Sequence, residues 1–205
     1  MKRFLKKIFQ TGEHNKIQVE QSVKDRFLKK GLIKVGKNSN ISKLTLENES
    51  GFEDIIHPIV IGDNCTIMGI IALHSRGSKI EIGNNVFLGP GSAIFCRDKI
   101  TIGSNVMISW GCTIIDTNAH SLKSKERKKD VEDWARGPRN KNWQNVITKE
   151  IKINNNCWIG FNSIITKGVE LGEGVVVGCG SVVTKGFNEY SIIGGNPAEF
   201  IKKTE

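Results

Sequence analysis

His120 is the residue whose type and position point most directly to chemistry. It ends the string DTNAH, directly after a regular stretch of the sequence and before a long irregular one. Histidine changes charge near neutral pH, so its imidazole can take a proton from a hydroxyl group. Asp116 and Asn118 precede it and could orient the imidazole or bind hydroxyl groups. A corner turn is the alternative role for both, because Asp and Asn favour turns.

The regular stretch repeats every six residues, a period that fits neither an α-helix nor an isolated strand. It predicts a coil with three flat sides, in which one aliphatic residue per side points inward and packs on the neighbouring coils. Gly and Asn in the strings IGDN, IGNN, IGSN and INNN suit the corners, where short residues or positive φ angles are needed. The aliphatic positions are Ile82, Leu88, Ile94, Ile102, Ile108, Ile114, Ile153, Ile159, Ile165, Leu171, Val177 and Val183.

The repeat stops after Ile114 and resumes at Ile151 or Ile153. We expect a loop insertion over about 119–150, because a connection of this length without its own apolar period is typical of a binding loop or a disordered segment. Trp134 and Trp143 indicate that part of the insertion docks, either on a neighbouring subunit or on a ligand.

Positive charge is concentrated in two segments of this 205-residue chain, whose net charge is +9. Residues 1–30 carry nine Lys and Arg against three acidic residues, and residues 121–150 carry nine against five. No nucleic-acid reader motif accompanies this charge, so we expect no nucleic-acid partner. The cations either remain solvated or attract an anion, such as a phosphate-bearing cofactor, an acidic glycan or a membrane surface.

The first ten residues, MKRFLKKIFQ, intersperse cations with Phe4, Leu5, Ile8 and Phe9. This spacing predicts an amphipathic arm that caps the open end of the coil. Weak contact of residues 1–10 with an anionic membrane surface is the alternative. We therefore divide the chain into an N-terminal arm and cap, 1–54, and a repeat domain, 55–205.

The sequence favours a cytoplasmic location, with the inner face of the membrane as the peripheral alternative. No apolar run approaches the roughly 20 residues needed to cross a bilayer. Five cysteines without a close pair indicate reduced thiols. Cys65, Cys112 and Cys157 fall on the small inward place of the repeat, where a thiol serves as compact apolar filler.

Four strings resemble the hexapeptide-repeat acyltransferases: IGNNVFLGPGSAI, ITIGSNVMISWGCTI, NNCWIGFNSIITKGVELGEGVVVGCGSVVTKG and IIGGNPAEFIKK. The nearest branch is similar to the maltose, galactoside and surface-polysaccharide O-acetyltransferases, and the resemblance covers about residues 55–203. It implies an all-β fold, a left-handed parallel β-helix, in a homotrimer with the acyl-donor site between subunits. It also implies transfer of an acetyl group from acetyl-CoA to a sugar hydroxyl in surface-polysaccharide biosynthesis, without a metal.

The same resemblance assigns roles to individual residues. His120 would be the general base, and Asp116 and Asn118 would lie at the sugar or glycan acceptor. Trp158 would lie beside the thioester, and the backbone N–H of Phe161 would stabilise the oxyanion. The remaining donor-site residues are Cys179, at the pantetheine arm, and Thr184, Lys185 and Lys202, at the nucleotide end.

Two departures from the family pattern leave other functions open. Gly91 and Phe161 stand where family members have Asn and Ser, so acceptor specificity is not carried over. An N-acetyltransferase acting on an amino sugar and a non-catalytic glycan-binding β-helix are the alternatives. A zinc-dependent hydratase would need three histidines around one metal, and His57, His74 and His120 include no closely spaced pair.

Overall fold

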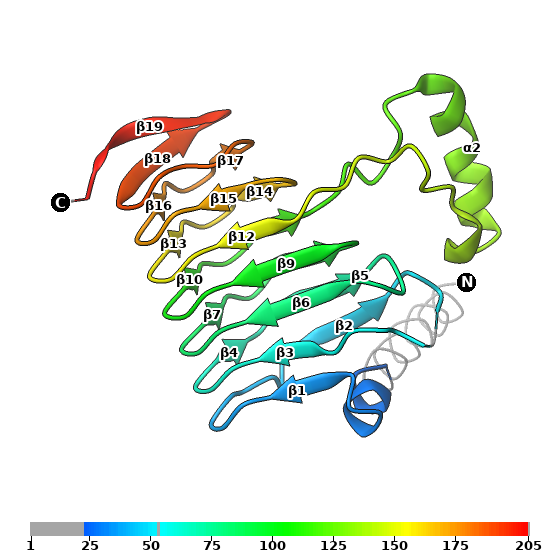
Figure 1. Ribbon diagram of the computed structural model, residues 1–205, viewed down its shortest axis with the longest axis horizontal. Helices are drawn as coiled ribbons and strands as arrows, with labels where there is room; N and C mark the ends of the chain where they lie inside the picture. The colour runs from blue at the N-terminus through cyan, green and yellow to red at the C-terminus, as the bar shows by residue number, and fades with distance from the viewer. Residues whose placement is uncertain (1–22, 53, 205) are drawn as a thin grey trace, which may run out of the picture.

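The chain folds into a three-sided prism of short parallel strands, seen in a computed structural model that describes residues 23–52 and 54–204. The chain passes in turn through three sheets, here named A, B and C, and each coil except the two at the ends adds one strand to each sheet (Figure 1). The predicted architecture, a left-handed parallel β-helix, is confirmed.

The strands of the three sheets are two to six residues long, and all neighbours are parallel except β18 and β19. Sheet A contains β1 (Ile33–Val35), β3 (Ile59–Ile61), β6 (Lys79–Ile82), β9 (Lys99–Ile102), β12 (Ile151–Ile153) and β15 (Glu170–Leu171). Sheet B contains β4 (Thr66–Ile67), β7 (Phe87–Leu88), β10 (Met107–Ile108), β13 (Trp158–Ile159), β16 (Val176–Val177), β18 (Ser191–Gly195) and β19 (Ala198–Lys203). Sheet C contains β2 (Thr45–Asn48), β5 (Ile70–Leu73), β8 (Ala93–Cys96), β11 (Thr113–Ile115), β14 (Ile164–Thr166) and β17 (Val182–Val183).

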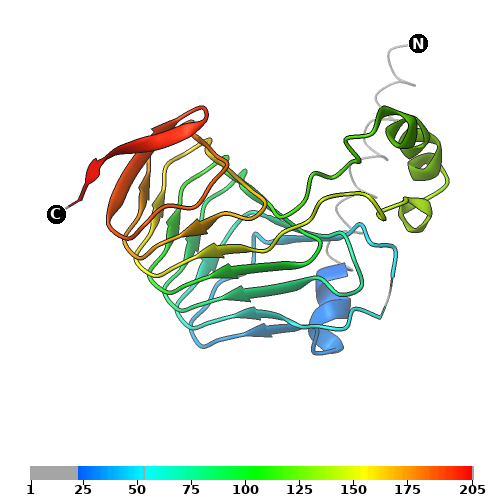
Figure 2. The same ribbon diagram turned by 45° about the horizontal axis from the view of Figure 1, so that its top comes forward.

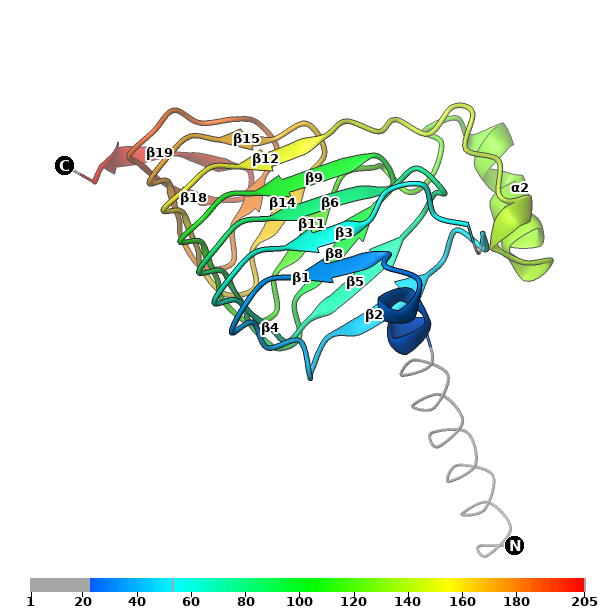
Figure 3. The ribbon, with the colours of Figure 1, turned by 60° about the horizontal axis from the view of Figure 1, so that its bottom comes forward.

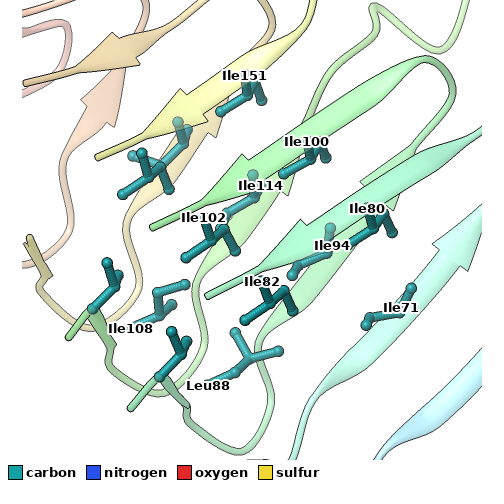
Figure 4. Close-up of a cluster of buried hydrophobic side chains, with 14 of the residues drawn as sticks. Ile71, Ile80, Ile82, Leu88, Ile94, Ile100, Ile102, Ile108, Ile114 and Ile151 are labelled. Atoms are coloured by element: carbon teal, nitrogen blue, oxygen red, sulfur yellow. The ribbon is translucent and has the colours of Figure 1, made fainter. Parts of the chain in front are cut away.

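The aliphatic positions of the six-residue repeat form continuous ladders inside the prism. On sheet A, Ile82, Ile102, Ile153 and Leu171 are register partners in successive coils, and none is more than 3% exposed. Figure 4 shows the equivalent stacking of isoleucines across several coils. Because each buried side chain of this size contributes about 1.5–3 kcal/mol, these ladders are the core of the fold.

The corner between sheets A and B adopts the left-handed backbone conformation in successive coils. Asn64, Asn85, Asn105 and Asn156 have φ angles of 56°, 56°, 58° and 62°. Asn tolerates this conformation better than most residues. Its side chain also links the coils, because Asn85 Nδ2 donates to Asn105 Oδ1 at 2.9 Å and Asn105 Nδ2 donates to Asn156 Oδ1 at 3.2 Å.

The cysteines expected to be apolar fillers are buried at the small inward places. Cys65, Cys112 and Cys157 are each 1% exposed, and all five cysteines are free thiols. Burial raises the pKa of the Cys157 thiol to about 11, so this thiol is protonated at neutral pH.

Residues 116–150 leave the prism between β11 and β12 without disturbing the coil. β12 still pairs with β9, and a bridge between Thr117 and Thr148 closes the base of the insertion. The insertion contains α2 (Ser124–Ala135) and the 3-10 helix η1 (Pro138–Asn140), and α2 projects from one edge of the prism (Figure 2). The periodicity of the sequence does not predict this helix, because the string SKERKKDVEDWA buries no apolar residue and Asp130 is its one buried residue.

At the N-terminal end of the prism, residues 23–29 are helical and lie beside β1 and β2 (Figure 3). Phe27 is 1% exposed and joins the core. The predicted arm over residues 1–10, and its alternative of membrane contact, lie outside the described residues. Within the described ranges, no helix is long and apolar enough to cross a membrane.

Candidate active site

His120 lies at the start of the insertion, one residue after Ala119, which has a φ angle of 60°. Its side chain is 54% exposed, whereas those of Asp130, on α2, and Lys141, after η1, are 7% and 2% exposed. His120 Nδ1 lies 2.6 Å from Asp130 Oδ2, and Lys141 Nζ lies 3.2 Å from the same oxygen. The insertion therefore brings a histidine, a carboxylate and an ammonium group together.

The contact with Asp130 determines which imidazole nitrogen can act as a base. A carboxylate accepts a hydrogen bond from an N–H, so in the neutral imidazole Nδ1 carries the proton and Nε2 keeps its lone pair. Burial alone would raise the pKa of Asp130, but the hydrogen bonds from His120 and Lys141 outweigh it and hold that pKa below its usual value. Lys141 Nζ also lies 3.1 Å from Nδ1, and these two donors share the Asp130 carboxylate.

A pocket of about 460 Å³ opens beside His120. Its apolar wall comes from sheet C, the base of the insertion, α2 and the returning segment, and consists of Phe95, Ile115, Ala119, Val131, Trp134 and Trp143. Asp130 and Lys141 also line it, as do Glu49 and His74, whose Oε2 and Nε2 atoms are 2.9 Å apart. The hydrogen bond from His74 holds the pKa of Glu49 below its usual value despite partial burial.

Trp143 anchors the insertion on the coil of its own chain. The Arg97 guanidinium lies 4.0 Å from the centre of the indole ring, and Lys141 Nζ lies 5.0 Å from it. The His74 ring centroid lies 5.7 Å from that of Trp143. Contact with a neighbouring subunit or a ligand was expected for this tryptophan, and both remain predictions. Within its own chain Trp143 packs on the prism and also lines the pocket. Trp134, by contrast, is 45% exposed at the pocket.

Asp116 and Asn118 differ in their surroundings. Asp116 is fully buried, and its carboxylate accepts hydrogen bonds from the backbone N–H groups of Arg97 and Asp98 at 2.8–3.0 Å. Burial raises the pKa of Asp116 in spite of these bonds. This geometry favours the turn role over contact with an acceptor. Asn118 is half-buried, and its carbonyl accepts the backbone N–H of His120 at 2.6 Å.

Trp158 and Phe161 lie at a different corner, between sheets B and C. Trp158 is 48% exposed, and its Nε1 donates to Ser109 Oγ at 3.3 Å. The ring of Phe161 stacks on that of Trp110, with centroids 5.2 Å apart. By the strand register, Pro90 occupies the place of Phe161 in the coil of β7. Proline has no backbone N–H, so the coil does not need the N–H at this corner for its own hydrogen bonds.

The other residues expected at the donor site, those for the pantetheine arm and the nucleotide end, lie in the coils that follow Phe161. Cys179 is exposed in the coil after Phe161, and Gly180 N–H donates to the Phe161 carbonyl at 2.8 Å. Thr184 and Lys185 follow β17, and Lys202 lies on β19, opposite Ile192. Lys185 Nζ forms an ion pair with Glu199, at 2.8 Å, that a bound phosphate would have to replace.

One protomer does not bring the two halves of the predicted site together. Trp110 occupies the same corner as Phe161 in the neighbouring coil, and the insertion begins six residues after Trp110, at Asp116. At roughly 3.3 Å per residue, the two corners are on the order of 20 Å apart across sheet C. His120 and the Phe161 N–H can therefore meet at one thioester only if they come from different protomers.

Four charged or polar residues of the pocket were not predicted as site residues: Asp130, Lys141, Glu49 and His74. Asp130 is one of four acidic residues in α2, and nothing in its spacing distinguishes it. His74 was considered only as a metal ligand. Within the described ranges, no three His, Cys, Asp or Glu side chains are grouped where a metal ion could bind.

Two family models match the repeat. The model for bacterial transferase hexapeptide (six repeats) matches residues 150–185, and the model for the hexapeptide repeat of succinyl-transferase matches residues 79–115. These two segments thus carry hexapeptide repeats, and the predicted resemblance is confirmed for the repeat and the fold. No curated protein sequence matches the chain.

Several solved structures share the fold. A mutant of AntD, an N-acyltransferase from Bacillus cereus, in complex with dTDP and coenzyme A, is 24% identical over 88% of each chain, with a TM-score of 0.63. The polySia specific acetyltransferase NeuO is 24% identical over 83% of this chain and 70% of its own, with a TM-score of 0.53. The acetyltransferase VCA0836 of Vibrio cholerae O1 biovar eltor, complexed with acetyl coenzyme A, is 23% identical over 85% and 72%, with a TM-score of 0.52.

Proposed function

We propose that this protein transfers an acetyl group from acetyl-CoA to a hydroxyl group of a sugar, with His120 as the general base. The observation that carries the proposal is the buried Asp130–Lys141 pair, which contacts His120 Nδ1 and leaves Nε2 free of protein hydrogen bonds among the described residues, in a histidine that lines a pocket. The similar solved structures support the donor, because AntD binds coenzyme A and VCA0836 binds acetyl coenzyme A. A surface polysaccharide is the proposed destination of the acetyl group.

The proposed reaction begins when Nε2 of His120 takes the proton of the acceptor hydroxyl. The acceptor oxygen then attacks the thioester carbon of acetyl-CoA, and negative charge develops on the carbonyl oxygen. The backbone N–H of Phe161 stabilises this oxyanion. When the C–S bond breaks, the CoA thiolate leaves and takes the proton back from Nε2, so that an acetyl ester and free CoA are formed and the imidazole is restored.

A homotrimer supplies the two halves of this site. The corner that carries Trp158 and Phe161 is rich in exposed apolar groups, since Met107 and Trp110 are 53% and 56% exposed beside them. Such an exposed apolar patch is typical of a protein interface. In the proposed trimer, this corner of one protomer faces His120 of the next, and Cys179, Thr184, Lys185 and Lys202 extend the donor groove toward the nucleotide.

Transfer to a hydroxyl is favoured over transfer to an amine. An unprotonated amine is a good nucleophile without a base, whereas a hydroxyl must lose its proton during attack. A histidine oriented by a buried carboxylate can act as the base that removes this proton from the hydroxyl. Asn118, beside the His120 backbone, remains the proposed acceptor contact.

Release of free CoA from acetyl-CoA, measured with a thiol reagent and a panel of sugars and amino sugars, tests the proposal. We expect release above an acceptor-free blank, with His120→Ala reducing turnover by about 10²–10⁴-fold while CoA binding measured by calorimetry is retained. His57→Ala, an exposed histidine outside the pocket, is the matched control and should behave as wild type. Retained turnover in His120→Ala, or no CoA release with any acceptor, would reject the proposal.

A further inference from the structure

The pocket beside His120 is mainly apolar, although the proposed acceptor is a sugar. Phe95 and Ile115 contribute apolar surface from sheet C, and Val131 and Trp134 contribute it from α2. The polar groups are engaged with one another: Asp130 with Lys141 and His120, and Glu49 with His74. Among the described residues, no hydrogen bond or ion pair involves His120 Nε2.

Val131 is the clearest sign that the apolar wall serves a ligand. It is 78% exposed on a helix that buries no apolar side chain, so it contributes little to packing. It lies one residue after Asp130 and lines the same pocket. Trp134, also exposed, follows three residues later, on the same side of the helix.

The pocket lies on the acceptor side of the base. All its lining residues belong to sheet C, to the segments that follow β2 and β5, or to the insertion, and none belongs to the corner of Trp158 and Phe161. A hydroxyl that gives its proton to Nε2 must approach from a molecule held near this pocket. The pocket is therefore positioned for part of the acceptor rather than for the nucleotide of the donor.

The chemistry of the wall selects among sugars. Each hydroxyl buried against it without a partner would weaken binding by about tenfold. A methyl or methylene group in the same place would gain from burial. We infer that the acceptor is a deoxy sugar, which presents a deoxygenated edge to Val131 and Trp134 while its reactive hydroxyl faces His120. This inference rests on the proposed function.

Matched glycosides test the inference. Methyl α-D-fucopyranoside and methyl α-D-galactopyranoside differ only in the hydroxyl at C6, and methyl α-L-rhamnopyranoside and methyl α-L-mannopyranoside form a second such pair. Saturation-transfer NMR with wild-type protein reports contact whether or not the glycoside is acetylated. We expect the C6 methyl protons of at least one deoxy glycoside to receive the strongest saturation. We also expect its CoA-release kcat/KM to exceed that of its hydroxylated partner about tenfold.

Val131→Thr is the diagnostic variant, because it keeps the side-chain shape and adds a hydroxyl to the wall. We expect it to reduce the preference for the deoxy sugar at least threefold, whereas Leu122→Thr, an exposed position outside the pocket, leaves the preference unchanged. Equal or weaker saturation of the deoxy members in both pairs would overturn the inference, as would an unchanged preference in Val131→Thr.

The alternative occupant of the apolar pocket is an acyl chain longer than acetyl on the CoA donor. If Val131→Thr lowers kcat/KM for butyryl-CoA relative to acetyl-CoA without changing the sugar preference, the pocket holds the donor's acyl chain and the inference is wrong. Turnover that shows no sugar preference leaves the proposed transfer reaction standing. Absence of CoA release with every acceptor counts against the reaction itself, while the NMR result still decides what the pocket binds.

Discussion

Asp130 and Lys141 determine the orientation and the neutral tautomer of the His120 imidazole. A single exposed imidazole can rotate and exchange tautomers, whereas the buried carboxylate holds Nδ1–H in one direction. Lys141 supplies the opposite charge that a buried carboxylate needs, and Trp143 and Trp134 flank its ammonium group. The three residues are separated by 10 and 11 positions in the sequence, so they act together only because the insertion folds back on itself.

Asp130→Asn should lower kcat by about 10²–10³-fold, because the amide can present an N–H to Nδ1 and favour the wrong tautomer. The KM for acetyl-CoA should be unchanged, since Asp130 is remote from the corner that carries Trp158 and Phe161. Steady-state kinetics on the purified variant provide the measurement. Asp133→Asn, on the same helix but paired with the exposed Arg136, is the control and should match wild type.

The lowered pKa of Asp130 predicts a pH dependence of stability. Its ordinary value is 3.8, and the folded state holds it lower, so the ionised carboxylate stabilises the fold above that value. This contribution is lost as the pH falls through the folded-state pKa. The difference in unfolding free energy between wild type and Asp130→Asn should be about 1 kcal/mol near pH 7 and shrink below pH 4. Urea unfolding at several pH values would show a constant difference if the account were wrong.

At the scale of elements, the prism and the insertion were predictable to different degrees. The ladders from Ile82 to Val183 follow from a six-residue period, because each coil must place the same residue in the same environment. His120 was recognisable because it stands where that period ends. α2 was not, since its stability rests on polar contacts such as those of Asp130 rather than on an apolar stripe. The partner of Trp143 was equally hidden, because Arg97 and His74 lie on other coils.

Excising residues 121–144 and joining the ends with a short Gly-Ser linker should separate folding from catalysis. The pairing of β9 with β12 and the bridge between Thr117 and Thr148 lie outside the deleted segment, so the prism should keep its strand content by circular dichroism. We expect the Tm to change by only a few degrees, about what 1 kcal/mol produces in a chain of this size. CoA release should fall to background because Asp130 and Lys141 are gone. Loss of the cooperative unfolding transition would show that the insertion is part of the core instead.

At the scale of the whole molecule, the prism separates the proposed base from the proposed donor groups, and in the proposed trimer assembly joins them. The distance between the two corners, on the order of 20 Å, is set by the width of sheet C and cannot be closed by side-chain motion. Closed symmetry with three copies would place the Phe161 corner of each protomer beside the insertion of the next. Light scattering coupled to gel filtration should therefore give three times the chain mass of 22.7 kDa.

Phe161→Pro offers a selective way to remove the proposed oxyanion donor, the backbone N–H of Phe161. Pro90 occupies the same corner in the coil of β7 and follows a glycine, as Phe161 does, so the backbone there accepts proline. The substitution deletes the N–H, whereas Phe161→Ala keeps it and removes only the ring that stacks on Trp110. We expect Phe161→Pro alone to lose activity and Phe161→Ala to stay within about tenfold of wild type.

Mixing the two inactive variants measures whether one active site is built from two chains. In this experiment, His120→Ala and Phe161→Pro protomers are unfolded, combined in equal amounts and reassembled at random. Each junction between two neighbouring protomers forms one proposed site. A junction is intact if the Phe161→Pro chain supplies His120 and the His120→Ala chain supplies the Phe161 N–H. One junction in four should satisfy this, so CoA release should recover to roughly a quarter of that of wild type treated in the same way. Mixed protein that remains as inactive as either parent, although it reassembles to the same mass, would contradict a site shared between protomers.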